Sequence, residues 1–248
     1  MMKASEFINI AQRIANRYST LYVMGCFGAP LNAATVGRYI RAYDYNAQAY
    51  RREQINEAVS HDGTVYGFDC VCFIKAILWG WDGDPENEYG GAVYQSNGVP
   101  DIGEDTMIDY CNDISEDFSS IIPGEVVWTR GHIGIYIADD TVVECTPAWK
   151  DGVQITSLGN KRRTAPYRIW AKHGKLPYIE YDTEKKEEAP MNRQDNIPSE
   201  WAKDAVQWAI DNRIMCGDEN GDLKLHENCT REMMCVFLKR LYDFMNRG

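Results

Sequence analysis

The sequence lacks several features that would assign it to other classes of protein. No apolar run reaches the length of a transmembrane helix, and no Cys-x-x-Cys pair is present to suggest a zinc or redox motif. Basic residues are too few to balance the acidic ones, and the net charge is −11. This charge argues against nucleic acid or an anionic membrane surface as the main partner.

The first residues do not form a charged leader followed by an apolar core and a cleavage site, so no signal peptide is predicted. They instead predict an amphipathic helix over residues 1–20, with Ser5 as its N-cap and a stripe of Phe7, Ile10, Ala11, Ile14 and Tyr18. We therefore expect synthesis in the cytoplasm, where the eight cysteines should be free thiols.

Apolar and aromatic residues are plentiful enough for a folded core, and 248 residues suit one large domain or a medium and a small one. A charged, polar stretch at 179–196 has the composition of a linker. It separates an expected domain at 1–178 from a C-terminal segment at 197–248. That segment predicts two helices, of which the first ends at Gly217.

The stretch from Gly67 to Trp81 is the strongest candidate for a site. Asp69 can cap a helix, and Cys70 would lie in its first turn, followed by residues that are apolar on nearly every face. The free N–H groups and the dipole of a helix N-terminus favour a thiolate, which is the nucleophilic form of cysteine. The alternative is a core helix that begins with a buried cysteine.

Further along the chain, the pattern changes to a period of two. Residues 132–137 alternate so that three isoleucines face one side, and His132, Gly134 and Tyr136 face the other. A three-residue hairpin loop at 138–140 would pair Ile137 with Thr141 and place Glu144 opposite Gly134, on the side of His132. A carboxylate in that position can orient an imidazole.

Alternatives remain open for each of these residues. His132 can be a structural strand histidine, and Glu144 can pair with Arg130 or Lys150 instead. A zinc site that includes Cys72 is disfavoured, because positions i and i+2 of a helix point apart. The other histidines, in apparent turns or loops, are expected to be solvated: His61, His173 and His226.

Residues 1 to about 178 resemble the NlpC-type papain-like cysteine peptidases, which cleave bacterial and phage peptidoglycan. Four segments carry the resemblance in the order of the family: Tyr22-Val23-Met24-Gly25, Asp69-Cys70, Pro123-Gly124-Glu125 and Gly131-His132-Ile133-Gly134-Ile135-Tyr136. Two departures concern the Ser-Gly that usually follows the nucleophile, here Val71-Cys72, and the third polar residue, here Glu144.

The resemblance implies an α+β fold with a papain-like core, in which a nucleophile helix packs on an antiparallel sheet. It implies Cys70 as nucleophile, His132 as base, Glu144 as the residue that orients the base, and Tyr22 as a candidate oxyanion donor. The implied activity is that of a phage endolysin, a hydrolase that needs no cofactor and lyses the wall of the bacterium in which it is made. Endopeptidase, amidase, inactive wall-binding protein and hydrolase of another amide all remain alternatives.

Residues 197–245 resemble one S-layer homology repeat. The resemblance lies in Trp201-Ala202, Trp208-Ala209, Gly217, Gly221-Asp222 and Thr230-Arg231-Glu232. It implies wall-linked polysaccharide as a partner, with Trp201, Gly217 and Arg231 as candidate binding residues. A homodimer formed through this segment is the alternative role.

Overall fold

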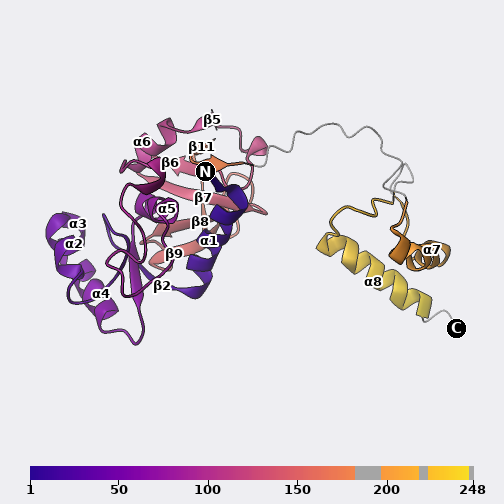
Figure 1. Cartoon of the computed structure of the whole chain (residues 1–248), viewed down its shortest axis with the longest axis horizontal. Coiled ribbons are helices and arrows are strands. Elements are labelled where there is room, and N and C mark those ends of the chain that lie inside the picture. The colour runs from indigo at the N-terminus through magenta and orange to yellow at the C-terminus, as the bar shows by residue number, and fades with distance from the viewer. Residues whose placement is uncertain (182–196, 218–222, 246–248) are drawn as a thin grey trace. The chain divides into compact units, whose positions relative to one another are not determined.

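The computed structural model describes residues 1–181, 197–217 and 223–245, and the chain divides into two compact units, Met1–Thr183 and Glu184–Gly248 (Figure 1). Each unit is described by itself. The expected linker at 179–196 lies mostly outside the described residues, as does the turn at 218–222. The first two residues of the expected linker form strand β12 (Ile179–Glu180), which pairs with β1 (Met2–Lys3) near the N-terminus.

The first unit is a mixed α+β structure built on a seven-stranded sheet with the order β10-β9-β8-β7-β6-β11-β5. Neighbouring strands are antiparallel, apart from the parallel pair β9–β10. The strands are β5 (Asn112–Ser115), β6 (Val126–Thr129), β7 (His132–Ala138), β8 (Thr141–Thr146), β9 (Gly152–Leu158), β10 (Tyr167–Arg168) and β11 (Lys172–Lys175).

A second, three-stranded sheet was not predicted. It has the order β2-β4-β3, where β2 is Ser19–Tyr22, β3 is Phe27–Pro30 and β4 is Val65–Phe68. Its strands, of four residues each, are too short to show a clear period. Residues 32–59 contain three helices, α2 (Val36–Ala42), α3 (Asp44–Ala47) and α4 (Ala49–Val59), which lie together at one end of this unit (Figure 1).

Helix α1 (Ala4–Arg17) begins earlier than expected. Its N-cap is Lys3, not Ser5, because β1 keeps the chain extended up to Lys3 and the helix starts directly after that pairing. The predicted apolar stripe is largely correct, since Phe7, Ala11 and Ile14 are fully buried.

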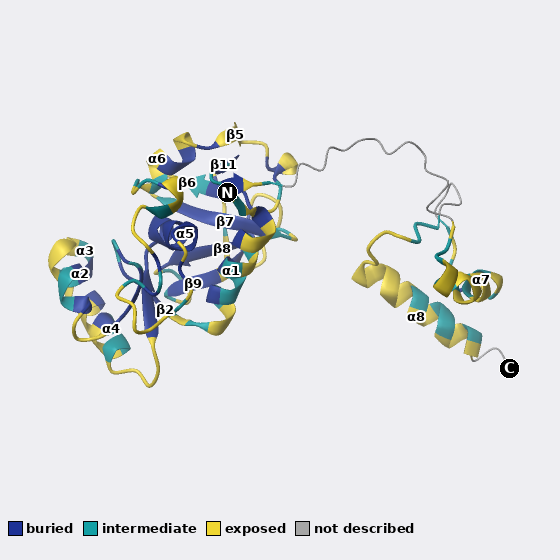
Figure 2. Ribbon diagram, in the orientation of Figure 1, coloured by how far each residue is buried: buried dark blue, intermediate teal, exposed yellow. Residues whose placement is uncertain are grey.

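Helix α5 (Cys70–Leu78) is buried along its whole length, as its apolar composition predicts (Figure 2). It packs against β7 and β8 on the face of the sheet that carries Ile133, Ile135 and Val143. The opposite face is covered by a separate apolar cluster: Phe118, Ile121, Val127, Tyr136, Val142, Leu158 and Trp170. The two faces of β7 therefore divide as the alternation predicts.

The hairpin between β7 and β8 differs from the expected one at its tip. Asp139 and Asp140 both have positive φ, at 48° and 56°, and form a two-residue loop that pairs Ala138 with Thr141. A register shift between Tyr136 and Ala138 absorbs the difference. Glu144 consequently still lies opposite Gly134, because the bulge restores the register that the shorter loop would have changed.

The segment from residue 82 to 103 is a long loop that contains one short 3-10 helix, η1 (Ser96–Gly98). It is followed by α6 (Glu104–Asp109) and, after β5, by the 3-10 helix η2 (Phe118–Ser120). Between these two helices, β5 forms one edge of the seven-stranded sheet.

The second unit contains a 3-10 turn, η4 (Glu200–Ala202), and two helices, α7 (Lys203–Asp211) and α8 (Arg231–Met245). Helix α7 ends before Gly217, with Asn212 as its C-cap. The Thr230 hydroxyl accepts a hydrogen bond from the Met233 N–H at 3.1 Å and caps α8. In the described residues, neither unit has a helix with both the length and the apolar character needed to cross a membrane.

Candidate active site

Cys70 is the first residue of α5, and Asp69 is its N-cap. The Asp69 carboxylate accepts hydrogen bonds from the Cys72 N–H at 2.6 Å and from the Gly25 N–H at 2.7 Å. Gly25 has a φ of 76°, and a Cβ there would overlap the Tyr43 ring. Only glycine can bring its N–H this close to Asp69, so the glycine-rich turn before β3 and the start of α5 form one fixed unit.

The thiol of Cys70 is 4 % exposed. Burial raises its pKa, the negative charges of Asp69 and Glu104 raise it further, and the backbone N–H groups of Ile133 and Val71 only partly offset them. The expectation of a thiolate favoured by the helix N-terminus is therefore wrong for this state of the molecule. Burial and the two carboxylates outweigh the N–H groups because an acidic, water-excluded environment disfavours a further negative charge.

His132 and Glu144 form the hydrogen-bonded pair predicted from the strand register. His132 Nε2 lies 2.7 Å from Glu144 Oε2, and the carboxylate is fully buried. A carboxylate can only accept, so Nε2 carries the proton, and Nδ1 is the nitrogen left to accept a proton in the neutral ring. Within the described part of the chain, Glu144 forms ion pairs with His132 and Arg168, and not with Arg130 or Lys150.

Two further residues hold Glu144 in place. The Thr156 hydroxyl donates to Oε1 at 2.6 Å, and the Arg168 Nε–H donates to Oε2 at 2.9 Å. Burial by itself would raise the pKa of the Glu144 carboxyl, but the hydrogen bond and charge of His132, the charge of Arg168 and the Thr156 hydroxyl together lower it. Glu144 is therefore ionised near neutral pH. Sequence reasoning missed both partners, although Thr156 is diagonal to Glu144 on the next strand.

The His132 ring stacks on Trp170, with ring centroids 5.5 Å apart and planes 16° from parallel. Gly134 leaves the space for this indole, because a Cβ there would lie 3.2 Å from Trp170 and 2.8 Å from Val142. The imidazole is thus held by Glu144 at one edge and by Trp170 across its face. This arrangement fixes its orientation without a bond to Nδ1.

The Cys70 sulfur lies near the N–H of Ile133, the residue that follows His132 on β7. Within the described part of the chain, no hydrogen bond joins the Cys70 thiol directly to the His132 ring. The structure therefore brings α5 to the beginning of β7 and leaves the two reactive groups unconnected. Catalytic hydrogen bonds are often long or unaligned until a substrate is bound.

Tyr22 ends β2 and is 8 % exposed. Burial raises the pKa of its phenol, and negative charge on Cys70, when that thiol ionises, and on Asp69 raises it further, so the hydroxyl keeps its proton. A phenol that stays neutral beside Cys70 can donate a hydrogen bond to a substrate oxygen.

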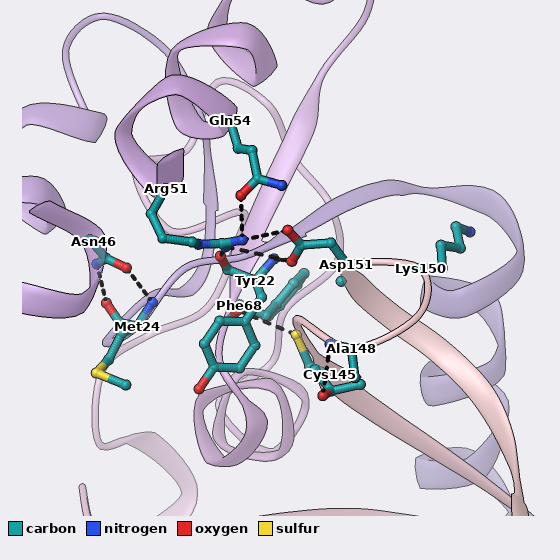
Figure 3. Close-up of polar contacts among 12 residues, drawn as sticks. Tyr22, Met24, Asn46, Arg51, Gln54, Phe68, Cys145, Ala148, Lys150 and Asp151 are labelled. Carbon is teal, nitrogen blue, oxygen red and sulfur yellow. Dashed lines mark hydrogen bonds and ion pairs between the residues drawn. The ribbon is translucent and has the colours of Figure 1, made fainter. Parts of the chain in front are cut away.

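The main chain of Tyr22 is held by a buried ion pair (Figure 3). Arg51, 1 % exposed, pairs with Asp151 at 2.5 Å and donates to the carbonyl of Tyr22, and Asp151 in turn accepts from the Tyr22 N–H at 3.3 Å. Gln54 accepts a further hydrogen bond from Arg51 at 2.8 Å. Helix α4 and the β8–β9 loop are thereby joined to β2, a connection that no local sequence pattern indicates.

The three C-terminal candidate residues lie in different environments. Trp201 is 90 % exposed, and it lines, with Gly217, a cavity of about 780 Å³ within the second unit. Arg231 is the first residue of α8 and is exposed, and it is not part of that lining. The structure therefore places two of the three at one cavity.

The remaining histidines divide between surface and core. His61 and His226 are exposed as expected, but the expectation for His173 is wrong, because it is buried on β11 against Glu125. Its position near the end of the domain gave no sign of the strand that buries it. Among the residues that the structure describes, no group of three or more His, Cys, Asp or Glu side chains is arranged to hold a metal ion.

No protein-family model matches this sequence, and a search of curated proteins gives no significant match.

Proposed function

We propose that this protein is a cysteine hydrolase with a papain-like core that cleaves an amide bond in the stem peptide of bacterial peptidoglycan. The observation that supports it most directly is the His132–Glu144 pair at the beginning of β7, beside the helix whose first residue is Cys70. A base oriented by a carboxylate, next to a thiol at a helix N-terminus, is the arrangement that nucleophilic cysteine catalysis requires. The choice of peptidoglycan rests on the NlpC-type motif order.

In the proposed reaction, His132 Nδ1 takes the proton of the Cys70 thiol as the sulfur attacks the substrate carbonyl. The Cys70 N–H, which has no helical acceptor in the first turn, and the Tyr22 hydroxyl donate to the developing oxyanion. His132 then gives its proton to the leaving amine, and water hydrolyses the thioester. Glu144 holds the ring and stabilises the imidazolium throughout.

The raised pKa of Cys70 makes deprotonation part of the reaction. The free enzyme holds a neutral thiol, and His132 removes the proton only when a substrate aligns the two groups. A small thiol reagent should therefore react slowly with Cys70 at neutral pH, and faster as the pH rises.

The second unit would bring the enzyme to the wall through wall-linked polysaccharide, with Trp201 and Gly217 at the cavity. Both an endopeptidase and an N-acetylmuramoyl-L-alanine amidase fit the same three catalytic residues. Mass spectrometry of the fragments released from purified cell walls distinguishes them, since an amidase frees the glycan from the whole stem peptide.

The test is the Cys70→Ala variant, assayed for release of amines from purified walls. We expect activity to fall to background while circular dichroism and thermal unfolding change no more than in a variant of a neighbouring buried cysteine, because the substitution removes a single buried sulfur atom. The matched control is Cys72→Ala, which removes another buried thiol of the same helix. Undiminished lysis by Cys70→Ala contradicts the assignment.

The second candidate is a catalytically inactive protein that binds the wall. The burial of Cys70 and its raised pKa favour this candidate. It predicts that no amine is released from walls of any peptide composition, while the chain still sediments with purified walls.

A further inference from the structure

Trp149 has a position that packing does not explain. It lies in the loop between β8 and β9, is 53 % exposed, and has a φ of 58°. A bulky residue rarely adopts this left-handed conformation, which costs on the order of 1 kcal/mol or more. Because about half of Trp149 is exposed to solvent, burial of its indole stabilises the fold too little to offset this cost.

The loop around Trp149 is held rigidly from beneath. The buried Gln154 side chain donates to the carbonyls of Ala148 at 2.9 Å and of Thr146 and Gly152, both at 3.3 Å. Asp151, two residues after Trp149, is held by Arg51 (Figure 3). The surrounding hydrogen bonds therefore impose the unusual backbone at Trp149, as happens at ligand-binding positions.

A continuous series of contacts connects this indole to the candidate active site. The Arg168 guanidinium lies 5.2 Å from the centroid of the Trp149 ring, and the same side chain donates to Glu144, which holds His132. The guanidinium covers part of the ring, and the exposed remainder is a flat apolar surface that is linked to His132 through Arg168 and Glu144. The loop also joins this region to Tyr22 through Asp151.

We propose that Trp149 is a stacking surface for a sugar ring of the substrate, next to the peptide bond that the site cleaves. This inference rests on the proposed function and names the glycan as a recognised part of that substrate. A pyranose ring presents an apolar face of C–H groups that matches an exposed indole. A neutral sugar also suits a protein whose net charge of −11 repels polyanions.

The test measures binding in the full-length Cys70→Ala chain, which cannot cleave its ligand. Two probes are compared by calorimetry: a disaccharide-peptide from purified peptidoglycan, and the same peptide without sugar. Trp149→Gly removes the ring and keeps the loop, because glycine adopts positive φ freely. Trp149→Phe keeps an aromatic face, and Tyr110→Ala removes an equally exposed ring elsewhere in the first unit.

We expect Trp149→Gly to weaken binding of the disaccharide-peptide about tenfold and to leave the sugar-free peptide unaffected. Trp149→Phe should keep most of the affinity, and Tyr110→Ala all of it. The inference is overturned if Trp149→Gly binds the disaccharide-peptide as its parent does, if it weakens both probes equally, or if the parent binds neither probe.

The outcome also separates this inference from the proposed function. If the chain with Cys70 intact cleaves no wall fragment but the sugar-dependent loss at Trp149 is observed, the stacking surface stands and the hydrolase assignment fails. If cleavage is observed and Trp149→Gly binds and cleaves both probes normally, the hydrolase assignment stands and the stacking surface fails.

Discussion

Two histidine–carboxylate pairs lie on the same face of the large sheet, and the structure uses them differently. Glu144, Gly134, Val127 and His173 are consecutive partners across β8, β7, β6 and β11, so their side chains point to one side. His132 bonds Glu144 at one end of this row, and Glu125 bonds His173 at the other.

The difference between the pairs is what remains free on each ring. His173 is bonded at both nitrogens, by Glu125 at Nδ1 and by the Asp117 carbonyl at Nε2, at 3.0 Å, and both side chains of the pair are buried. His132 is bonded at Nε2 and is partly exposed. A fully satisfied histidine supports the fold, whereas one with a free nitrogen near solvent can transfer protons. The pattern of bonds, more than the presence of a carboxylate, distinguishes a catalytic from a structural histidine.

The largest effect is expected from removing the imidazole of His132, whose Nδ1 is proposed to take the proton of Cys70. His132→Ala should lower kcat/KM for wall cleavage by about 10³-fold or more, because it removes the base that takes the proton of Cys70. Its free energy of unfolding should fall less than that of a His173 variant, since the ring is partly exposed and Thr156 and Arg168 still hold Glu144. Steady-state release of amines and urea denaturation measure both quantities. Retained activity would show that a group other than His132 is the general base.

The converse change tests the buried pair. His173→Ala should lower the free energy of unfolding by about 3–5 kcal/mol, because it leaves the buried Glu125 without its partner. The activity of the folded fraction should be unchanged, as measured by active-site titration alongside thermal unfolding. If His173→Ala proved stable but inactive, the assignment of His173 as a structural histidine and of His132 as the catalytic one would be contradicted.

The carboxylates provide a sharper comparison than the histidines. Glu144→Gln keeps the shape of the side chain but lets its amide donate to Nε2, which places the ring proton on Nδ1, where it blocks transfer from Cys70. We expect kcat to fall on the order of a hundredfold or more with little change in KM. Glu125→Gln is the matched control and should alter unfolding alone, so equal loss of activity in both variants would contradict the assigned roles.

The pH dependence of stability is the smallest expected effect. Burial would lower the pKa of His173, but the hydrogen bonds to Glu125 and the Asp117 carbonyl, together with the charges of both residues, outweigh it and raise the pKa. The stabilisation is therefore complete below the unfolded-state pKa of about 6.5 and is lost as the pH rises through the higher folded-state pKa.

Urea denaturation of the parent chain and of His173→Gln, repeated between pH 5 and pH 9, measures this effect. The stability difference between the two should shrink as the pH rises. A difference that stays constant, or that grows with pH, would show that the His173 pKa is not raised.

Local sequence was sufficient to predict the parts whose determinants are close along the chain. Asp69 before an apolar run predicts the cap and the buried helix at Cys70, because capping and burial depend on neighbouring residues. The alternation at 132–137 predicts which side of the strand His132 occupies. The register with Glu144 follows because the other register would bury a carboxylate among the isoleucines.

Tertiary structure decided what distant segments contribute. Arg168 and Thr156 reach Glu144 from two other strands, Arg51 reaches Tyr22 and Asp151 from a separate helix, and β11 buries a histidine that looked like a loop residue. None of these contacts leaves a periodic signal, because they depend on strand order and side-chain length.

The protonation of the Cys70 thiol likewise depends on distant segments of the chain. Its place at a helix N-terminus is a local property that the sequence determined, and by itself it favours the thiolate. The burial of Cys70 and the charges around it, including that of Glu104, are set by how the domain packs, and they raise the pKa. The sequence by itself therefore determined which groups are present and which face they occupy. Packing alone decided their protonation, because desolvation and charge depend on every segment that surrounds a group.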